Sequence, residues 1–196
     1  MSCAAGSMDP LSETLAQITA ALGRAGIRYA VGGSIASSAR GVWRSTFDID
    51  LIADIRPDDA QSLAVTLGTD WYADPEMIQD AIQAGRSFKV IQKRLAYNVE
   101  IFPATEEFHF AQLERAAVVL LGIEKIPCPV TTTEDILLAK LRWYRGGGGV
   151  SERQWDDIVG LIAANVALDQ DYLQRWAPRL GVSGMLENAR TEAQIK

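Results

Sequence analysis

The sequence has little of what defines several classes of protein. It holds 196 residues with two cysteines, Cys3 and Cys128, and one histidine, His109. Two cysteines so far apart favour free thiols in a reducing cytoplasm over a disulfide framework or a zinc site. No apolar run approaches the roughly 20 residues that cross a membrane, and the first ten residues lack the basic and apolar regions of a secretion signal. The sequence therefore predicts a cytoplasmic globular protein with no membrane partner.

An excess of positive charge is also absent. Nineteen lysines and arginines stand against 25 aspartates and glutamates, which gives a net charge of −6. Proteins that bind nucleic acid through its phosphates are usually basic, so a broad nucleic-acid surface is disfavoured. One stretch, 81–99, has four basic residues and no acidic one, namely Arg86, Lys89, Lys93 and Arg94. It is either a hairpin whose lysines discourage sheet-to-sheet pairing or a local patch that favours RNA.

Residues up to about 130 mix strand-like and helical patterns. Asp9 and Pro10 predict a helix start, and apolar residues at helical spacing extend this helix to about Leu22. The same reasoning predicts helices over 35–40, 56–67 and 74–84, and strands over 27–31, 47–53, 87–92, 96–102 and 117–121. The segment 108–113 is ambiguous. The segment 126–130 contains two prolines, so it is predicted to be at best an edge strand.

The pattern becomes helical after residue 130. A capping box over 131–135 predicts a helix to about Arg145, and the glycine run 146–149 predicts a flexible loop. Three more helices are predicted, from Ser151, from Asp169 or Asp171, and over 182–193. The predicted fold class is α+β. A loose tail over 1–9 precedes a mixed β-sheet core over 10–130, which is flanked by helices, and a C-terminal helical bundle follows over 131–196.

The predicted strand 47–53 carries two charges among apolar residues. Side chains at i and i+2 of a strand point to one face, with Cα atoms about 6.5–7 Å apart, so Asp48 and Asp50 face away from the core together. Two carboxylates this close repel each other unless a cation lies between them. Magnesium suits the pair, and two ions can share it in an in-line phosphoryl displacement. The alternative is a strand with one solvated face.

Two further motifs accompany these aspartates. Gly32, Gly33 and Ser34 follow a predicted strand and precede a short helix, where backbone N–H groups can approach an anion closely. On its own this motif is also a common turn. Glu100 interrupts the later strand 96–102, and it completes an acidic cluster if the two strands are neighbours. It would then serve as a metal ligand or as the group that accepts a proton.

The order of these motifs resembles the nucleotidyltransferase superfamily, which has the polymerase-β-like fold. The resemblance rests on Gly-Gly-Ser, a short helix, Asp-x-Asp on the next strand and a third acidic residue on a later strand, and it extends over about 11–180. The stretches 31–51 and 134–162 are similar to small bacterial nucleotidyltransferases, including those of abortive-infection toxins.

This resemblance implies roles for individual residues. Residues 32–34 would hold the terminal phosphates of a nucleoside triphosphate, Asp48 and Asp50 would bind Mg²⁺, and Glu100 would replace a carboxylate that is more often aspartate. A hydroxyl of an acceptor would attack the α-phosphate and release pyrophosphate. The acceptor stays open between tRNA, protein and a small molecule. The alternative is a catalytically inactive binding module of a toxin–antitoxin or defence system, with a cognate antitoxin as partner.

Such a transfer depends on neutralising developing charge, so further cations are expected near the phosphates. Arg44, just before the Asp-x-Asp strand, and Lys140, in an otherwise apolar helix, are candidates for nucleotide binding. The alternatives are a surface arginine and a lysine that extends to solvent. Arg153 and Asp156, at i and i+3, are second-tier candidates or a routine surface pair.

Three ring side chains have a weaker claim to a role. Trp143 and Tyr144 either stack on a base or, as the favoured interpretation, pack in the core. His109 lies between two phenylalanines and is interpreted as structural.

Overall fold

The computed structural model describes residues 8–41, 48–165 and 167–194. Its helices are α1 (Pro10–Arg24), α2 (Gly33–Ala39), α3 (Ala60–Leu67), α4 (Pro75–Gln83), α5 (Glu107–Arg115), α6 (Thr133–Gly146), α7 (Glu152–Ala164), α8 (Gln170–Arg179) and α9 (Ser183–Ala193), with a 3-10 turn at Pro57–Asp59. Its strands are β1 (Arg28–Val31), β2 (Asp48–Asp54), β3 (Trp71–Tyr72), β4 (Phe88–Gln92), β5 (Tyr97–Pro103), β6 (Ala117–Leu121) and β7 (Ile126–Val130). The predicted α+β class is confirmed.

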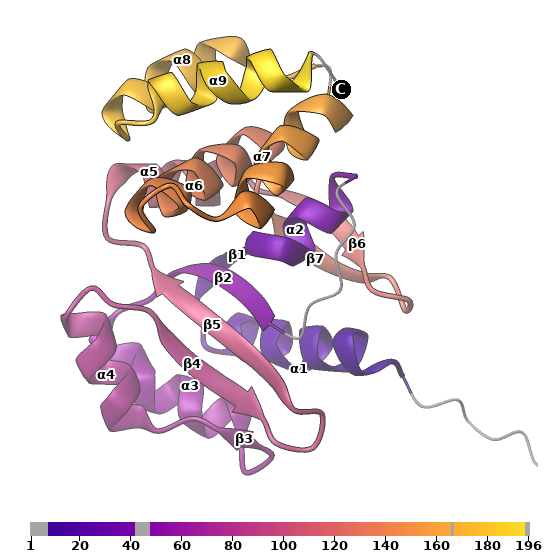
Figure 1. Cartoon of the computed structure of the whole chain (residues 1–196). Coiled ribbons are helices and arrows are strands. Elements are labelled where there is room, and N and C mark those ends of the chain that lie inside the picture. The colour runs from indigo at the N-terminus through magenta and orange to yellow at the C-terminus, as the bar shows by residue number, and fades with distance from the viewer. Residues whose placement is uncertain (1–7, 42–47, 166, 195–196) are drawn as a thin grey trace, which may run out of the picture.

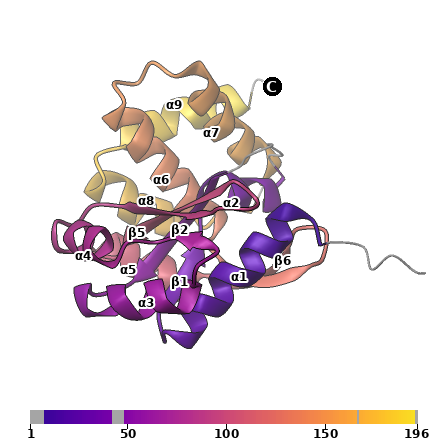
Figure 2. The same ribbon diagram turned by 90° about the horizontal axis from the view of Figure 1, so that it is seen from below.

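One mixed sheet joins these strands in the order β3-β4-β5-β2-β1-β7-β6 (Figure 1). The central neighbours β2 and β5 run parallel, while β1 and β4 flank them in the antiparallel sense. Helices α1, α3 and α4 cover one face of the sheet, as the view from below in Figure 2 shows. On the other side lie α2 and α5 to α7, with α8 and α9 as the outermost layer (Figure 1).

Alternation along β2 and β5 separates an apolar face from a charged one. Ile49 and Leu51 of β2 are fully buried beside Val99 and Ile101 of β5, and they belong to the core beneath α1 and α3. Because successive side chains point to opposite faces, the polar residues between them project to the side of α2 and α6. The apolar pattern that buries this sheet therefore also collects its carboxylates on one face.

A second hydrophobic core lies among the C-terminal helices. Leu137 and Leu141 of α6, Ile158 of α7 and Leu173 of α8 are fully buried in it. Phe108 joins them from α5, which settles the ambiguous segment 108–113 as a helix that packs against the C-terminal layer. The division of the chain at residue 130 stays a prediction.

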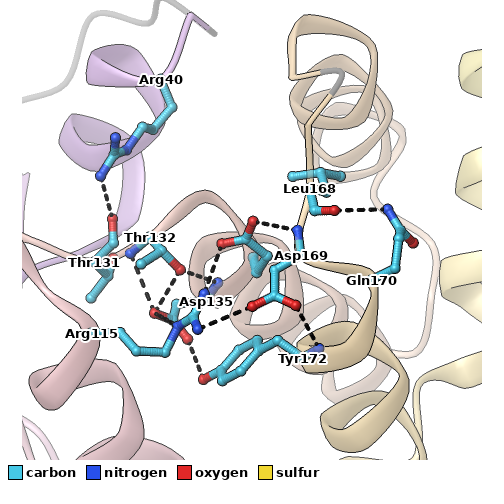
Figure 3. A network of polar contacts seen from close by, with 10 residues as sticks. Arg40, Arg115, Thr131, Thr132, Asp135, Leu168, Asp169, Gln170 and Tyr172 are labelled. Carbon is cyan, nitrogen blue, oxygen red and sulfur yellow. Dashed lines mark hydrogen bonds and ion pairs between the residues drawn. The ribbon is translucent and has the colours of Figure 1, made fainter.

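A polar network fastens the start of α6 to α5 and α8 (Figure 3). The predicted capping box is present, with Thr132 as its first residue and Asp135 three residues later. The Asp135 carboxylate is fully buried and accepts hydrogen bonds from Tyr172 Oη at 2.6 Å and Thr132 Oγ1 at 2.8 Å. The Arg115 guanidinium lies 3.9 Å over the Tyr172 ring and pairs with Glu134 at 3.4 Å. These contacts fix the direction in which α6 leaves the sheet.

Removing the Tyr172 hydroxyl tests this network. Burial raises the pKa of Asp135, and the hydrogen bonds and Arg115 counter the rise only in part. Tyr172→Phe is expected to lower the free energy of unfolding by about 1–3 kcal/mol, because the buried carboxylate loses its shortest donor. Urea unfolding at pH 7 measures this change. Tyr72→Phe, at an exposed tyrosine, is the control with an effect under about 0.5 kcal/mol. Equal effects of the two changes would show that the network does not stabilise the fold.

The predicted edge position of the segment 126–130 is wrong. β7 lies between β1 and β6, and β6 is the edge strand. The Thr131 N–H donates to the Val31 carbonyl of β1, so alternation turns Pro127 and Pro129 toward β1 as well. Proline has no N–H to donate, and β7 pairs with β1 only at Val31. The prolines therefore weaken one side of β7 and leave its ladder with β6 complete.

No helix among the described residues is long and apolar enough to cross a membrane.

Candidate active site

The turn between β1 and α2 brings backbone N–H groups against Asp50. The Gly32 N–H donates to the Asp50 carbonyl at 2.8 Å, and the Ser34 N–H donates to the Asp50 carboxylate. Gly33 adopts φ +58°, a left-handed conformation that favours glycine. A Cβ atom at Gly33 would lie 1.7 Å from Asp50 Oδ2, so the backbone passes closer to the carboxylate than any side chain permits.

This close approach makes Gly33→Ala a specific test of the turn. The added methyl group clashes with Asp50 and strains the backbone, so we expect a loss of about 1–3 kcal/mol of stability. We also expect nucleotide binding to be lost, because both the turn and the carboxylate must shift. Thermal unfolding and calorimetric titration measure the two effects. Gly184→Ala, where nothing lies within 4 Å of the added Cβ, is the control. A Gly33→Ala protein as stable as this control would contradict the described geometry.

The three predicted carboxylates do lie on one face of the sheet. Asp50 of β2 is directly opposite Glu100 of β5 in the parallel register, and Asp48 is opposite Asn98. Neighbouring strands lie about 4.8 Å apart, so these side chains are mutual neighbours. The Asn98 side chain donates to Asp48 Oδ1 at 3.1 Å. The expected position of Glu100 beside the aspartate pair depended on this strand order, which the register shows, whereas its role in the site stays a prediction.

The pKa of Asp50 is raised from its ordinary value of 3.8. Burial is the largest cause, followed by the negative charges of Glu100 and Asp48. The Ser34 N–H and the positive charge of Lys140 offset this rise only in part. The cluster therefore lacks positive charge, and a cation beside Asp50 would relieve the repulsion.

Glu100 has partners on the side away from the aspartates. Its Oε1 accepts a hydrogen bond from Ser87 Oγ at 2.8 Å, and its Oε2 lies 3.4 Å from Lys89 Nζ. In the described part of the chain, no three histidine, cysteine, aspartate or glutamate side chains are arranged to hold a metal ion. Asp48 and Asp50 nevertheless fit Mg²⁺, which takes one or two carboxylates and completes its shell with water and substrate phosphates.

Lys140 of α6 forms an ion pair with a neighbouring helix. Its side chain is 17% exposed and pairs with Asp157 of α7 at 3.0 Å, while its charge acts on the Asp50 carboxyl. The side chain is therefore held within the protein and does not extend to solvent. The partner Asp157 was missed at the sequence level, since an interval of 17 residues between two helices carries no pairing signal.

The other charged residues that the sequence singled out are Arg44, Arg153, Asp156 and the basic residues of the stretch 81–99. Arg44 lies outside the described residues. Arg153 is exposed, and the described ion pairs do not join it to Asp156. Three of the four residues in the basic stretch contact this chain's own groups: Lys89 contacts Glu100, Lys93 the Thr69 carbonyl and Arg94 Glu13.

The ring side chains divide into two groups. Trp143 is 63% exposed, so its assignment to the core is wrong, whereas Tyr144 is half-buried against Trp155. His109 accepts from the Thr105 N–H through Nδ1, and its Nε2 lies 3.0 Å from Glu106. These contacts satisfy both ring nitrogens of the histidine.

A cavity opens beside Glu100, between β4 and α4. Its volume is about 410 Å³. Its polar lining consists of two acidic residues, Asp80 and Glu100, two basic residues, Arg86 and Lys89, and the hydroxyl residue Ser87, with Met77 and Phe88 as apolar walls. The cavity lies on the side of Glu100 away from the aspartates, where Ser87 and Lys89 contact this carboxylate.

Comparisons with known proteins find similar folds among solved structures. No family model and no curated protein sequence matches the chain. Among solved structures, it is similar to the antibiotic-resistance factor ANT(2'')-Ia in solution, with a TM-score of 0.52 and 16% identity over 91% of this chain and 96% of that chain. The crystal structure of ANT(2'')-Ia with adenylyl-2''-tobramycin gives a TM-score of 0.51 and 15% identity over 87% and 96%. At this identity the likeness shows a shared fold.

Proposed function

This chain has the nucleotidyltransferase fold, and we propose that it transfers a nucleoside monophosphate from a nucleoside triphosphate to a hydroxyl group of a small molecule. The observation that carries the proposal is the meeting of Asp48, Asp50 and Glu100 on one face of the sheet, against the Gly33 turn. All three carboxylates are present, whereas a non-catalytic module has no need to keep them.

Each part of the site has a role in this reaction. The turn at residues 32–34 would hold the terminal phosphates through the Ser34 hydroxyl, because the Gly32 and Ser34 N–H groups donate to Asp50. Asp48 and Asp50 would hold Mg²⁺, which would neutralise charge on the transferring phosphate. The acceptor oxygen forms a bond to the α-phosphorus as the bond to the pyrophosphate oxygen breaks, and pyrophosphate leaves. Glu100, directly opposite Asp50, accepts the proton of the acceptor hydroxyl. Lys140 supplies further positive charge to the triphosphate.

The cavity beside Glu100 supports a small acceptor. A polar molecule bound in it would lie next to Glu100, and its charged walls suit a substrate that carries hydroxyl and charged groups. The structural neighbour ANT(2'')-Ia is bound to adenylyl-2''-tobramycin, which is a nucleotide-modified small molecule. The basic stretch supports RNA less well, because three of its four cations already contact groups of this chain.

The experiment that tests the function follows the label of α-³²P nucleoside triphosphates. The protein is incubated with each triphosphate, Mg²⁺ and a cell extract separated into small-molecule, RNA and protein fractions. We expect labelled product in the small-molecule fraction, together with pyrophosphate, and none with Asp50→Asn. Label in RNA or protein would contradict the acceptor class. No label and no pyrophosphate with any nucleotide would contradict nucleotidyl transfer itself.

A further inference from the structure

Two aromatic side chains lie outside both hydrophobic cores. Phe102 of β5 and Trp143 of α6 contact each other, with ring centroids 6.0 Å apart and ring planes at 77°. Neither belongs to the two core clusters, and Trp143 is 63% exposed. A tryptophan usually buries most of its large apolar surface, so an exposed indole beside a second ring indicates a binding surface.

Phe102 connects this aromatic pair to the acidic face. It lies two residues beyond Glu100 on β5, so both side chains project from the same face, with Cα atoms about 6.5–7 Å apart. In the register of the sheet Phe102 is opposite Ile52 of β2, one pair of residues beyond the Asp50–Glu100 pair. The phenylalanine ring therefore borders the carboxylates directly.

Trp143 contacts Phe102 from helix α6, which packs over the acidic face of the sheet. It follows Lys140 by three residues on α6, so both side chains project from one side of the helix. The contact of Trp143 with Phe102 shows that this side of α6 faces β5. Arg142, the preceding residue, is fixed by an ion pair with Glu106. The indole is thus presented from an anchored turn of the helix.

The direction in which a bound nucleotide extends indicates which part of it would lie against Phe102 and Trp143. In the proposed reaction its terminal phosphates lie at the turn of residues 32–34. This turn follows β1 on one side of β2, whereas Phe102 lies on β5 at the other side. The nucleoside follows the α-phosphate and extends away from that turn. The acceptor has its own space, because the cavity beside Glu100 includes neither Phe102 nor Trp143 in its lining.

We propose that Trp143, supported edge-on by Phe102, is the surface on which the base of the nucleoside triphosphate stacks. This inference rests on the proposed function. The edge-to-face contact leaves a face of the indole open to a planar ring, and stacking of this kind accepts every base because each has a π-face. The site therefore binds adenine and guanine nucleotides with similar affinity.

Calorimetric titration of the full chain in Mg²⁺ tests the assignment, with ATP, GTP and inorganic triphosphate as ligands. Trp143→Ala is expected to weaken ATP and GTP binding by about tenfold, while the affinity for inorganic triphosphate stays within about twofold of wild type. Trp143→Phe, which keeps a ring, is expected to lose less. Val65→Ala, at an exposed apolar residue on α3, is the control and is expected to bind as wild type.

Other outcomes separate the two proposals. If Trp143→Ala binds ATP as tightly as wild type, or loses ATP and inorganic triphosphate equally, base stacking is excluded while nucleotide binding stands. If the wild-type protein binds no nucleoside triphosphate with Mg²⁺, the proposed function fails and the base site fails with it. Thermal unfolding confirms that the variants are folded, since an exposed side chain contributes little to stability.

Discussion

Asp50→Asn is expected to abolish nucleotidyl transfer and, in the absence of metal, to raise the free energy of unfolding. The rate is expected to fall at least about 1000-fold, since a bound metal ion supplies several kcal/mol of transition-state stabilisation. Stability is expected to rise by about 0.5–2 kcal/mol, because asparagine keeps an acceptor for the Ser34 N–H and removes a charge that faces Glu100 and Asp48. Pyrophosphate release and urea unfolding in a metal chelator measure the two effects.

The pH dependence of this stability gain has a definite sign. The pKa of Asp50 is raised in the folded protein, so between 3.8 and that raised value the folded state binds more protons than the unfolded state. Ionisation of Asp50 therefore lowers the free energy of unfolding of the wild-type protein as pH rises from 3.8 to the raised pKa. This loss of stability remains at higher pH. Asp50→Asn has no such deficit, so its advantage grows from about pH 4 to a plateau. An Asp50→Asn protein less stable than wild type at pH 7 would show that the aspartate is structural.

Lys140→Met is expected to slow transfer by about 100-fold, because the transferring phosphate loses a positive charge in a partly buried site. The same change also breaks the ion pair with Asp157. A control must therefore distinguish the effect of losing this ion pair from the effect of losing the lysine charge near the phosphate. Asp157→Asn breaks the ion pair and keeps the lysine charge, and it is the matched control. Initial rates at saturating nucleotide, measured where both variants are folded, give the comparison.

The ratio of the two effects decides the role of Lys140. If the lysine contacts the triphosphate, Lys140→Met loses at least about tenfold more activity than Asp157→Asn. Equal losses would mean that Lys140 acts only by joining α6 to α7. Lys140→Arg provides a further check, because it keeps the charge and is expected to recover part of the rate.

Local patterns predicted most of the elements and the acidic face. Alternation in β2 was enough to place Asp48 and Asp50 together, because the period of a strand depends on backbone geometry alone. The cap at Thr132 was equally local, and the structure confirms it. The meeting of Glu100 with Asp50 needed one further assumption, that two strands 50 residues apart are neighbours, and the resemblance to nucleotidyltransferases supplied it.

The features that sequence reasoning missed all depend on tertiary neighbours. The prolines of β7 predicted an edge strand. In the structure β7 has a neighbour on each side, and the prolines weaken only its pairing with β1. The helical position of Trp143 was compatible with burial, and only the packing of α6 leaves the indole exposed. Asp157 gave no signal because its partner, Lys140, lies on another helix.

The central claim is that Asp48 and Asp50 together bind a divalent ion beside the Gly33 turn. Mn²⁺ in place of Mg²⁺, with a non-hydrolysable ATP analogue, allows the bound metal to be counted by electron paramagnetic resonance. We predict saturable binding to the wild-type protein and at least about tenfold weaker binding to Asp48→Asn and to Asp50→Asn, because each change removes a charged ligand. Binding to both variants with wild-type affinity would contradict the claim.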